Sequence, residues 1–487
     1  MSFAPLIETL VAPELNGSWL ERLAREPGCV LLRSAGFDSP QARYSLLAVR
    51  PFLTLTARGS RCELRGPDGH QTLFGDPWRI LSDWLRRYEM PPEADQPFPL
   101  GGCFGYWGYD LKQFTEPKLT RRTPNDLELP DAWVGFYDHL LVVDHRANTA
   151  RIVSTGLEPD GSRSLARARA GFAFWQRALK GEALEPCWLN PERPSAGTAW
   201  REHAHAVCHP EASDLFSTMT REAYLQAVRQ AQHYIRHGHI YQVNLSQRLT
   251  LPRAIPGWEF FNALLAESPA PFAAYLNPGP FQIASSSPEL FLRQRGNLIQ
   301  TRPIKGTRPR AADLDQDARY TYELQTSAKE IAELVMITDL LRNDLGRVCE
   351  YGSVHVPDLM RLERYPHVQH LVSTVEGRLR PHLSHLDALA ACFPGGSITG
   401  APKFRAMEII EELEPVSRGP YTGCLGYLGF NRESQLSIAI RKALCSADAT
   451  HFHVGAGIVA DSDPQAEYEE TWVKARGFLA ALKHTQL

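Results

Sequence analysis

The sequence lacks the features of a membrane-spanning, secreted or nucleic-acid-binding protein. No run of about 18 apolar residues occurs among its 487 residues, which argues against a membrane-spanning helix. The segment 1–17 has an acidic residue within its apolar stretch and no basic region, so we do not expect a signal peptide. The 52 lysines and arginines nearly balance the 55 aspartates and glutamates, and the net charge of −3 provides no basic excess for nucleic acid.

A cysteine framework is also missing. The nine cysteines are an odd number, are scattered along the chain and never occur as CxxC. Neither a disulfide framework nor a structural zinc site is therefore expected, and a reducing cytoplasm fits this usage. The composition, with 43% hydrophobic and 22% charged residues, is that of an ordinary globular protein. The length predicts two or three domains or one large composite fold.

The order of predicted elements indicates the fold class. Short strands bounded by Gly, Pro, Asp and Ser clusters dominate the region 1–186. The segment 187–213 is rich in Pro, Glu, His and Ala and is interpreted as a linker. Over 214–487, long helices alternate with groups of consecutive strands. Consecutive strands without helices between them predict antiparallel sheets, and hence an α+β fold.

Two predicted helices each carry a pair of glutamates three residues apart. Glu330 and Glu333 lie on one side of the segment 327–342, which is apolar nearly all round, and Glu467 and Glu470 lie on the last helix. Burying an unpaired carboxylate costs roughly several kcal/mol, so such a group must be paired or must bind a cation. Ordinary ion pairs are the alternative for both helices. Taken together, the two pairs favour a site for a hard cation such as Mg²⁺.

A lysine and two glycine-rich turns are further candidates. Lys305 lies in the segment PIKGTRPR at 303–310, between a predicted strand and a predicted helix. A nucleophilic lysine needs its pKa lowered from about 10.4 by burial or nearby cations, and the arginines of this segment are such cations. A surface turn with ordinary basic residues is the alternative. The glycine turns at 394–403 and 454–459 carry backbone N–H groups that could hold an oxyanion.

These segments, together with AKEIAE at 328–333 and EYEET at 467–471, resemble the family of chorismate-using enzymes, which includes anthranilate, aminodeoxychorismate, isochorismate and salicylate synthases. The resemblance covers residues 218–482, and GGCFGYWGYDL at 101–111 extends it more weakly toward the N-terminus. It implies two antiparallel β-sheets packed as a sandwich and surrounded by helices. It also implies an organisation into an N-terminal region, a linker and a chorismate-binding catalytic domain, at 1–186, 187–213 and 214–487.

Two positions distinguish members of this family. The isochorismate and salicylate synthases carry a water-activating lysine where this chain has Gln242, and anthranilate synthases usually have alanine where it has Lys305. The pattern therefore resembles the aminodeoxychorismate synthases. It implies that Lys305 attacks ring C2 while Glu289, as a protonated general acid, helps the C4 hydroxyl leave, after which ammonia adds at C4. A supporting rather than covalent lysine is the alternative.

The resemblance also implies a metal site and a substrate site. Mg²⁺ would be held by Glu333 and Glu470, with Glu330 and Glu467 close to the metal or its waters. Arginine suits the carboxylates of chorismate because its fork donates two parallel hydrogen bonds. The implied substrate-binding residues are Gly306, Thr307, His370, Tyr421, Arg441, Gly455, Ala456, Gly457 and Lys474.

The activity implied is the conversion of chorismate and ammonia to 4-amino-4-deoxychorismate, on the path to 4-aminobenzoate and folate. A separate glutamine amidotransferase subunit would supply the ammonia. The alternatives are anthranilate synthase component I and a catalytically inactive homologue that binds chorismate or tryptophan. Cys103 in GGCFG formally resembles a glutaminase nucleophile, but its context is not strand–turn–helix, so it is interpreted as a small core residue.

Some relatives also have a tryptophan pocket. In this chain it would involve Ser34, Pro271, Phe272 and Ala273. Arg33 stands where feedback-regulated anthranilate synthases usually carry glutamate. This argues against regulation and leaves a structural ligand, or none, as the alternatives.

Overall fold

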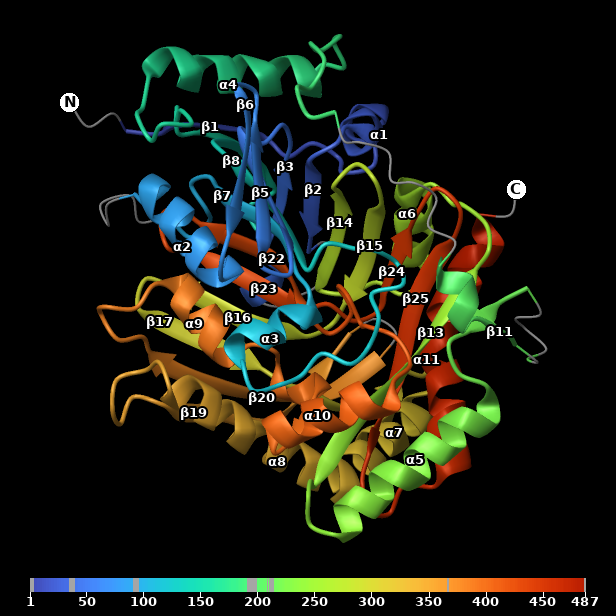
Figure 1. The fold of residues 1–487 in the computed structure, drawn as a ribbon. Coiled ribbons are helices and arrows are strands. Elements are labelled where there is room, and N and C mark those ends of the chain that lie inside the picture. Colours follow the sequence, from blue (N-terminus) through green and yellow to red (C-terminus); the bar gives the residue numbers. More distant parts are fainter. Residues whose placement is uncertain are drawn as a thin grey trace.

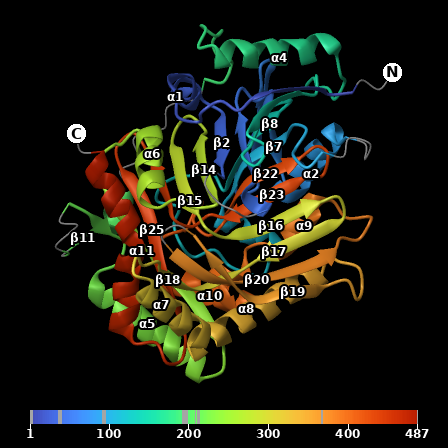
Figure 2. The same cartoon turned by 180° about the vertical axis from the view of Figure 1, so that it is seen from behind.

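A computed structural model describes most of the chain, and Figures 1 and 2 show it from opposite sides. Residues 191–198, 208 and 210–213 of the predicted linker lie outside the described residues. The described ranges are 4–34, 40–90, 96–190, 199–207, 209, 214–365 and 368–485.

The larger sheet has 13 strands, and every pair of neighbours in it is antiparallel. Apolar runs such as HLLVVD and FAAYLN form strands that are buried along their whole length. In spatial order the strands are β1 (Leu6–Val11), β10 (Thr149–Ser154), β9 (His139–Asp144), β3 (Tyr44–Ala48), β2 (Cys29–Arg33), β14 (Phe272–Asn277), β15 (Gln282–Ser287), β24 (Lys442–Cys445), β25 (Thr450–Ile458), β13 (Gln242–Leu251), β12 (Phe216–Ser217) and β11 (His205–Ala206), with β21 (Gly400–Ala401) beside β13.

The second sheet has 12 strands and is also antiparallel throughout. Its outermost hairpin is the more exposed part, and polar residues are frequent there. In spatial order the strands are β18 (Ile304–Pro309), β20 (Val368–Arg378), β17 (Leu298–Arg302), β16 (Leu290–Arg295), β23 (Ser434–Ile438), β22 (Cys424–Gly429), β7 (Gly102–Trp107), β8 (Ala132–Tyr137), β4 (Leu53–Arg58), β5 (Arg61–Gly66) and β6 (Gly69–Phe74), with β19 (His355–Arg364) also paired to β20.

Helices surround the two sheets. Side-chain caps start several of them: Ser327 accepts a hydrogen bond from the backbone N–H of Glu330, and Asp463 accepts one from that of Ala466. The helices are α1 (Ser18–Arg25), α2 (Pro77–Tyr88), α3 (Lys112–Thr115), α4 (Leu165–Leu179), α5 (Arg221–Arg236), α6 (Gly257–Glu267), α7 (Leu314–Thr326), α8 (Ala328–Gly346), α9 (His385–Cys392), α10 (Lys403–Leu413) and α11 (Pro464–His484). Short 3₁₀ helices lie at Pro40–Ala42, Tyr109–Leu111, Ala199–His203 and Gly396–Ile398.

The predicted α+β fold of two antiparallel sheets surrounded by helices is confirmed. Both sheets combine strands that are far apart in the sequence: β2 pairs with β14, and β7 pairs with β22. The regions 1–186 and 214–487 therefore share their sheets, while the division at these boundaries stays a prediction. In Figures 1 and 2, α5, α7, α8 and α10 gather at one end of the molecule, and α1 and α4 lie at the other. Helix α11 runs along one side, where it packs against α5 and α6.

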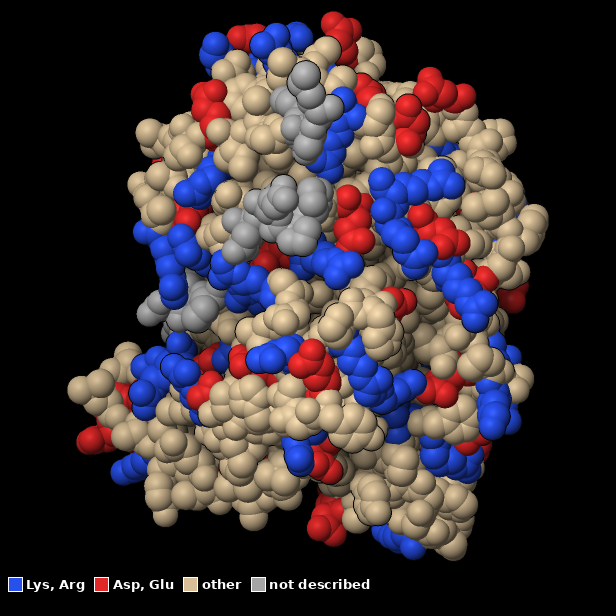
Figure 3. All heavy atoms as spheres, turned by 90° about the vertical axis from the view of Figure 1, so that its left-hand side faces the viewer, with Lys and Arg blue, Asp and Glu red and all other residues tan. Residues whose placement is uncertain are grey.

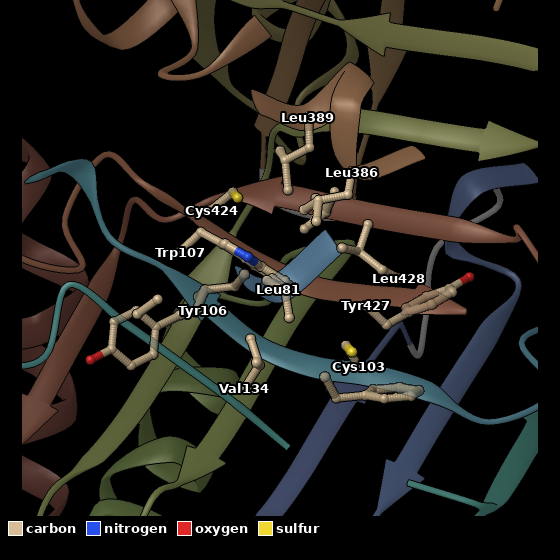
Figure 4. Close-up of a cluster of buried hydrophobic side chains, with 14 of the residues drawn as sticks. Leu81, Cys103, Tyr106, Trp107, Val134, Leu386, Leu389, Cys424, Tyr427 and Leu428 are labelled. Atoms are coloured by element: carbon tan, nitrogen blue, oxygen red, sulfur yellow. The ribbon is translucent and has the colours of Figure 1, made fainter. Parts of the chain in front are cut away.

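Cys103 lies in the hydrophobic core. Figure 4 shows it among apolar side chains, with Val134 of β8 and Tyr427 of β22 nearby. The residue is 0% exposed, and burial raises the pKa of its thiol well above the usual range. A thiol that is buried and protonated is a poor nucleophile. The interpretation of Cys103 as a core residue is confirmed.

The surface carries charges of both signs. Figure 3 shows lysine and arginine side chains interspersed with aspartate and glutamate over one face. This mixture matches the small net charge of the sequence. Among the described helices, none combines the length and the apolar character needed to cross a bilayer.

Candidate functional site

The two glutamate-bearing helices meet at the same end of the molecule. Helix α8 packs against β18 and β20 of the second sheet, and α11 packs against β25 of the larger sheet. An ion pair joins the two helices, with Lys329 Nζ 3.8 Å from Glu467 Oε1. Since each helix rests on a different sheet, this contact lies where the two sheets approach each other.

Lys305 lies between these elements. A β-bulge in β18 separates Lys305 from Thr307, and Gly306 occupies it with a φ of 72°. Only glycine adopts such a conformation without strain, and a bulge re-aims the side chains beside it. Lys305 Nζ lies 3.4 Å from Glu333 Oε2, and both side chains are largely buried. A Cβ placed on Gly457 of β25 would lie 3.8 Å from the same Nζ.

Glu289 is buried just before β16, with 6% of its surface exposed. Burial raises the pKa of Glu289 to about 7, against the opposing effects of a hydrogen bond with Ser397 and of the positive charge of Lys305. About half of this carboxyl group is therefore protonated near neutral pH. A carboxyl of this pKa, within electrostatic reach of an amine, is suited to donate a proton at neutral pH.

The carboxylates of α11 lie in unlike environments. Burial raises the pKa of Glu467, whose Oε1 accepts a hydrogen bond from Ser462 at 2.6 Å. Burial acts in the same direction on Glu470, but Lys474, Lys329 and Lys305 lower its pKa overall. Glu470 is therefore an anion at neutral pH, and Lys305 is close enough to affect it.

The four predicted metal-binding glutamates do not form one tight cluster. Within the described ranges, no three Asp, Glu, His or Cys side chains are grouped closely enough to hold a metal ion. Glu333 contacts Lys305, Glu470 contacts Lys474 at 2.7 Å, and Glu330 lies 3.5 Å from an arginine, Arg308. Mg²⁺ takes few protein carboxylates and completes its shell with water and substrate oxygens. One carboxylate from each helix, Glu333 and Glu470, fits that requirement, and the metal role of all four stays a prediction.

The predicted substrate residues of the second sheet lie together. Thr307 Oγ1 is 2.9 Å from His370 Nδ1 on the neighbouring strand β20. Burial lowers the pKa of His370 to about 4, and the positive charge of Arg441 adds to the effect, so the imidazole is neutral. Among the described side chains, no carboxylate pairs with the Arg441 guanidinium, whose pKa burial lowers. A half-buried guanidinium without a partner is suited to bind a carboxylate.

The predicted substrate residues of the larger sheet frame the other side. Lys474 Nζ donates a hydrogen bond to the Gly455 carbonyl at 2.7 Å, which ties α11 to β25. Ala456 is buried between the two glycines. Tyr421 is buried, and its ring stacks on His453 with 4.7 Å between the centroids. Contacts to substrate by these residues stay predictions.

The sequence from residue 34 to residue 480 matches the family model described as chorismate binding enzyme. The chain belongs to the chorismate-binding enzymes. It is 39% identical to the aminodeoxychorismate synthase component 1 of Klebsiella aerogenes, over 97% of each chain. It is 40% identical to the anthranilate synthase component 1 of Thermus thermophilus, over 96% of this chain and 94% of that protein. The crystal structure of anthranilate synthase component I from Streptococcus pneumoniae superposes with a TM-score of 0.75 at 27% identity, over 96% of this chain and 99% of that one.

Within this chorismate-binding enzyme, the residues of the predicted tryptophan pocket lie in another part of the larger sheet. Ala273 of β14 is next to Arg33 of β2 in the sheet register, and the backbone N–H of Ser34 donates to Ser45 Oγ at 3.0 Å. Pro271 and Phe272 are buried beside them. Strands β15 and β24 separate this place from β25, so it is distinct from the site around Lys305. Tryptophan binding there stays a prediction.

Sequence reasoning missed several partners in the site. It did not identify Ser397 as a neighbour of Glu289, or the pairing of Lys329 with Glu467. Lys329 lies inside the AKEIAE segment, so its position beside Glu330 was a usable signal. Ser397 lies in the glycine turn at 394–403, which was interpreted only as a candidate oxyanion-binding loop.

Proposed function

We propose that this chain converts chorismate and ammonia to 4-amino-4-deoxychorismate. Its relatives include aminodeoxychorismate and anthranilate synthase components at nearly equal identity, so similarity alone does not choose between the two products. The observation that carries the proposal is the position of Lys305. Its amine lies 3.4 Å from Glu333 and within electrostatic reach of Glu289 and Glu470, so a nucleophile and a proton donor lie in one site beside the predicted metal ligands.

The proposed reaction has two substitutions at the ring. Lys305 gives up a proton to solvent, and its neutral amine forms a bond to ring C2 while the ring double bonds shift and the C4 hydroxyl takes the proton of Glu289 and leaves as water. Ammonia then forms a bond to C4, the double bonds shift back and the C2–N bond to Lys305 breaks. The proton that the added nitrogen loses restores Glu289. The nitrogen ends on the carbon that lost its oxygen, as a para-amino product requires.

Mg²⁺ is part of the proposal. Glu333 and Glu470 would hold it, with Glu330 and Glu467 near its waters. A hard cation there would bind and neutralise the ring carboxylate of chorismate. The lysines around the site, Lys305, Lys329 and Lys474, offset the charge of the carboxylates, which supports a site with few acidic ligands.

We also propose that a glutamine amidotransferase subunit delivers the ammonia. The relatives are named component 1, which implies a second component. The purified chain alone is expected to form no aminated product from glutamine, because the glutaminase-like Cys103 is buried in the core. Incubation with chorismate, Mg²⁺ and glutamine without ammonium checks this. If the wild-type chain formed aminated product from glutamine and the Cys103→Ala variant did not, the prediction would be contradicted.

The decisive test is product identification. Purified chain is incubated with chorismate, Mg²⁺ and ammonium at alkaline pH, and the products are separated by chromatography and identified by mass and absorbance. Accumulation of 4-amino-4-deoxychorismate is expected. Anthranilate as the main product would instead support the second candidate, anthranilate synthase. Chorismate binding without turnover would support an inactive homologue.

Replacing Gly457 by alanine is expected to weaken chorismate binding about tenfold with little change in stability. The new methyl group would lie 2.5 Å from Gln242 Nε2, a side-chain end that can move, and 3.8 Å from Lys305 Nζ, in space proposed for the substrate. A tenfold loss corresponds to about 1.4 kcal/mol of binding free energy. Calorimetric titration with chorismate measures the effect. Gly346→Ala, whose methyl group meets open space at the end of α8, is the matched control. Equal affinities in the two variants would contradict the prediction.

A further inference from the structure

A small cavity lined by basic side chains lies on one face of the larger sheet, beside Tyr421. Lys442 begins β24, and His451 and His453 alternate along the neighbouring strand β25, so the three side chains project from the same face. The loops 125–129 and 417–420 close the cavity from the other side. The cavity is small, with room for about one water molecule or one small ion.

Lys442 is a buried amine without a partner among the residues that the structure describes. Its exposed fraction is 2%, and no hydrogen bond or ion pair joins it to the described side chains. Lys112 is equally buried but lies 3.0 Å from Asp110 and 2.7 Å from Glu411. A buried ammonium without a counter-charge costs several kcal/mol, on the order of magnitude found for other buried ions. Lys442 therefore needs either to lose its proton or to gain an anion.

The charges around the cavity leave one positive unit unbalanced. Arg248 is paired with Asp126, with which it shares two hydrogen bonds. Arg418 is paired with Glu414, at 2.9 Å and 2.6 Å. These two pairs neutralise themselves, so Lys442, when protonated, is the remaining cation. One monovalent anion would balance it.

The two imidazoles add hydrogen-bond donors rather than charge. Burial holds the pKa of both His451 and His453 well below the usual range, and the positive charges of Lys442 and Arg248 add to the effect. His451 Nδ1 lies 2.9 Å from Thr250 Oγ1, so when that hydroxyl donates, the other ring nitrogen carries the proton. A neutral imidazole with one N–H is a suitable donor to an anion.

We propose that this cavity binds a small monovalent anion of the size of chloride, held by the Lys442 ammonium with His451 and His453 as neutral donors. Burial lowers the pKa of Lys442 to about 7 in the absence of an anion, and Arg248 adds to the effect. A bound anion favours the charged amine, so anion binding above pH 7 takes up one proton. The affinity is then expected to fall by up to about tenfold for each pH unit above 7. The proposal is independent of the reaction at Lys305.

Bromide locates the site directly. Crystals of the wild-type chain soaked in sodium bromide are expected to show an anomalous peak in the cavity, within hydrogen-bonding distance of Lys442 Nζ. Bromide peaks only on the protein surface would overturn the proposal. A water molecule bound to a neutral Lys442 would leave no anomalous peak and would overturn it equally.

Thermal unfolding in sodium chloride and in sodium gluconate, at equal ionic strength, tests the same site in solution. Chloride at about ten times its dissociation constant is expected to raise the Tm of the wild type by about 1–2 °C more than gluconate does at pH 6.5, and by less at pH 9. Lys442→Met is expected to lose this difference, whereas Lys483→Met, a change at an exposed lysine, keeps it. If Lys442→Met does not fold, the wild-type measurements still decide. A chloride effect that is absent in the wild type, or unchanged in Lys442→Met, would overturn the proposal.

Discussion

Replacing Lys305 by alanine is expected to lower kcat for 4-amino-4-deoxychorismate by at least about 10³-fold. The proposed reaction needs a nucleophile at ring C2, and no other described amine lies as close to both Glu333 and Gly457. Chorismate affinity is expected to change little, because the carboxylates of the substrate are assigned to Arg441, the Gly455–Gly457 backbone and the metal. Steady-state kinetics with ammonium, together with calorimetric binding of chorismate, separates the two effects.

A second variant distinguishes a nucleophilic lysine from one that only provides charge. Lys305→Arg keeps a cation beside Glu333, but a guanidinium is not deprotonated in proteins and cannot attack C2. If Lys305 is the nucleophile, the arginine and alanine variants are expected to lose kcat to the same extent. Recovery of most of the activity by arginine would show a supporting role. Lys483→Ala, at an exposed position on the last turn of α11, is the control for removing a lysine.

Local sequence patterns were sufficient for the fold class but not for the strand order. Runs such as HLLVVD form strands because apolar residues fill every position, and consecutive strands without intervening helices pair antiparallel. The pairing of β2 with β14 and of β7 with β22 joins segments far apart in the chain. These pairings depend on how the two sheets pack, and no local pattern encodes that.

In the candidate site, too, the sequence identified the main residues but not their contacts. Lys305, Glu333 and Glu470 were identified from motifs, and the structure brings them together at the contact of α8 with α11. Their partners depend on tertiary distances that spacing cannot supply. Lys442 illustrates this limit, because a single lysine at the start of a strand is indistinguishable in the sequence from a solvated one. Only the closing loops make it a buried amine.

Replacing Glu289 by glutamine is expected to lower kcat by about 10²–10⁴-fold and to remove a step in the pH profile. Because the acid must be protonated, the ratio of wild-type to Glu289→Gln kcat/KM is expected to fall by up to about tenfold for each pH unit above the Glu289 pKa of about 7. The effect of pH on the Lys305 amine is common to both proteins and cancels in this ratio. The concentration of free NH₃ must be held constant across the series, since ammonium also loses its proton as pH rises. Glu222→Gln, at an exposed glutamate, is the control and is expected to keep the wild-type profile. A ratio that stays constant from pH 6 to pH 9 would contradict the role of Glu289.

The same substitution is expected to stabilise the fold at alkaline pH. The pKa of Glu289 is raised in the folded state from its ordinary value of 4.5 to about 7, so the folded state binds the proton more tightly than the unfolded state. The contribution of this group to stability is therefore fully present below pH 4.5 and is lost as pH rises through 7. The difference amounts to about 3 kcal/mol above pH 8, on the basis of 1.36 kcal/mol for each unit of pKa. Glutamine has no charge to bury and avoids this loss. The Tm of Glu289→Gln should then exceed that of the wild type at pH 8.5 by more than it does at pH 5.5. Higher stability with lower activity would show that the fold keeps a costly buried acid at this position for its chemistry.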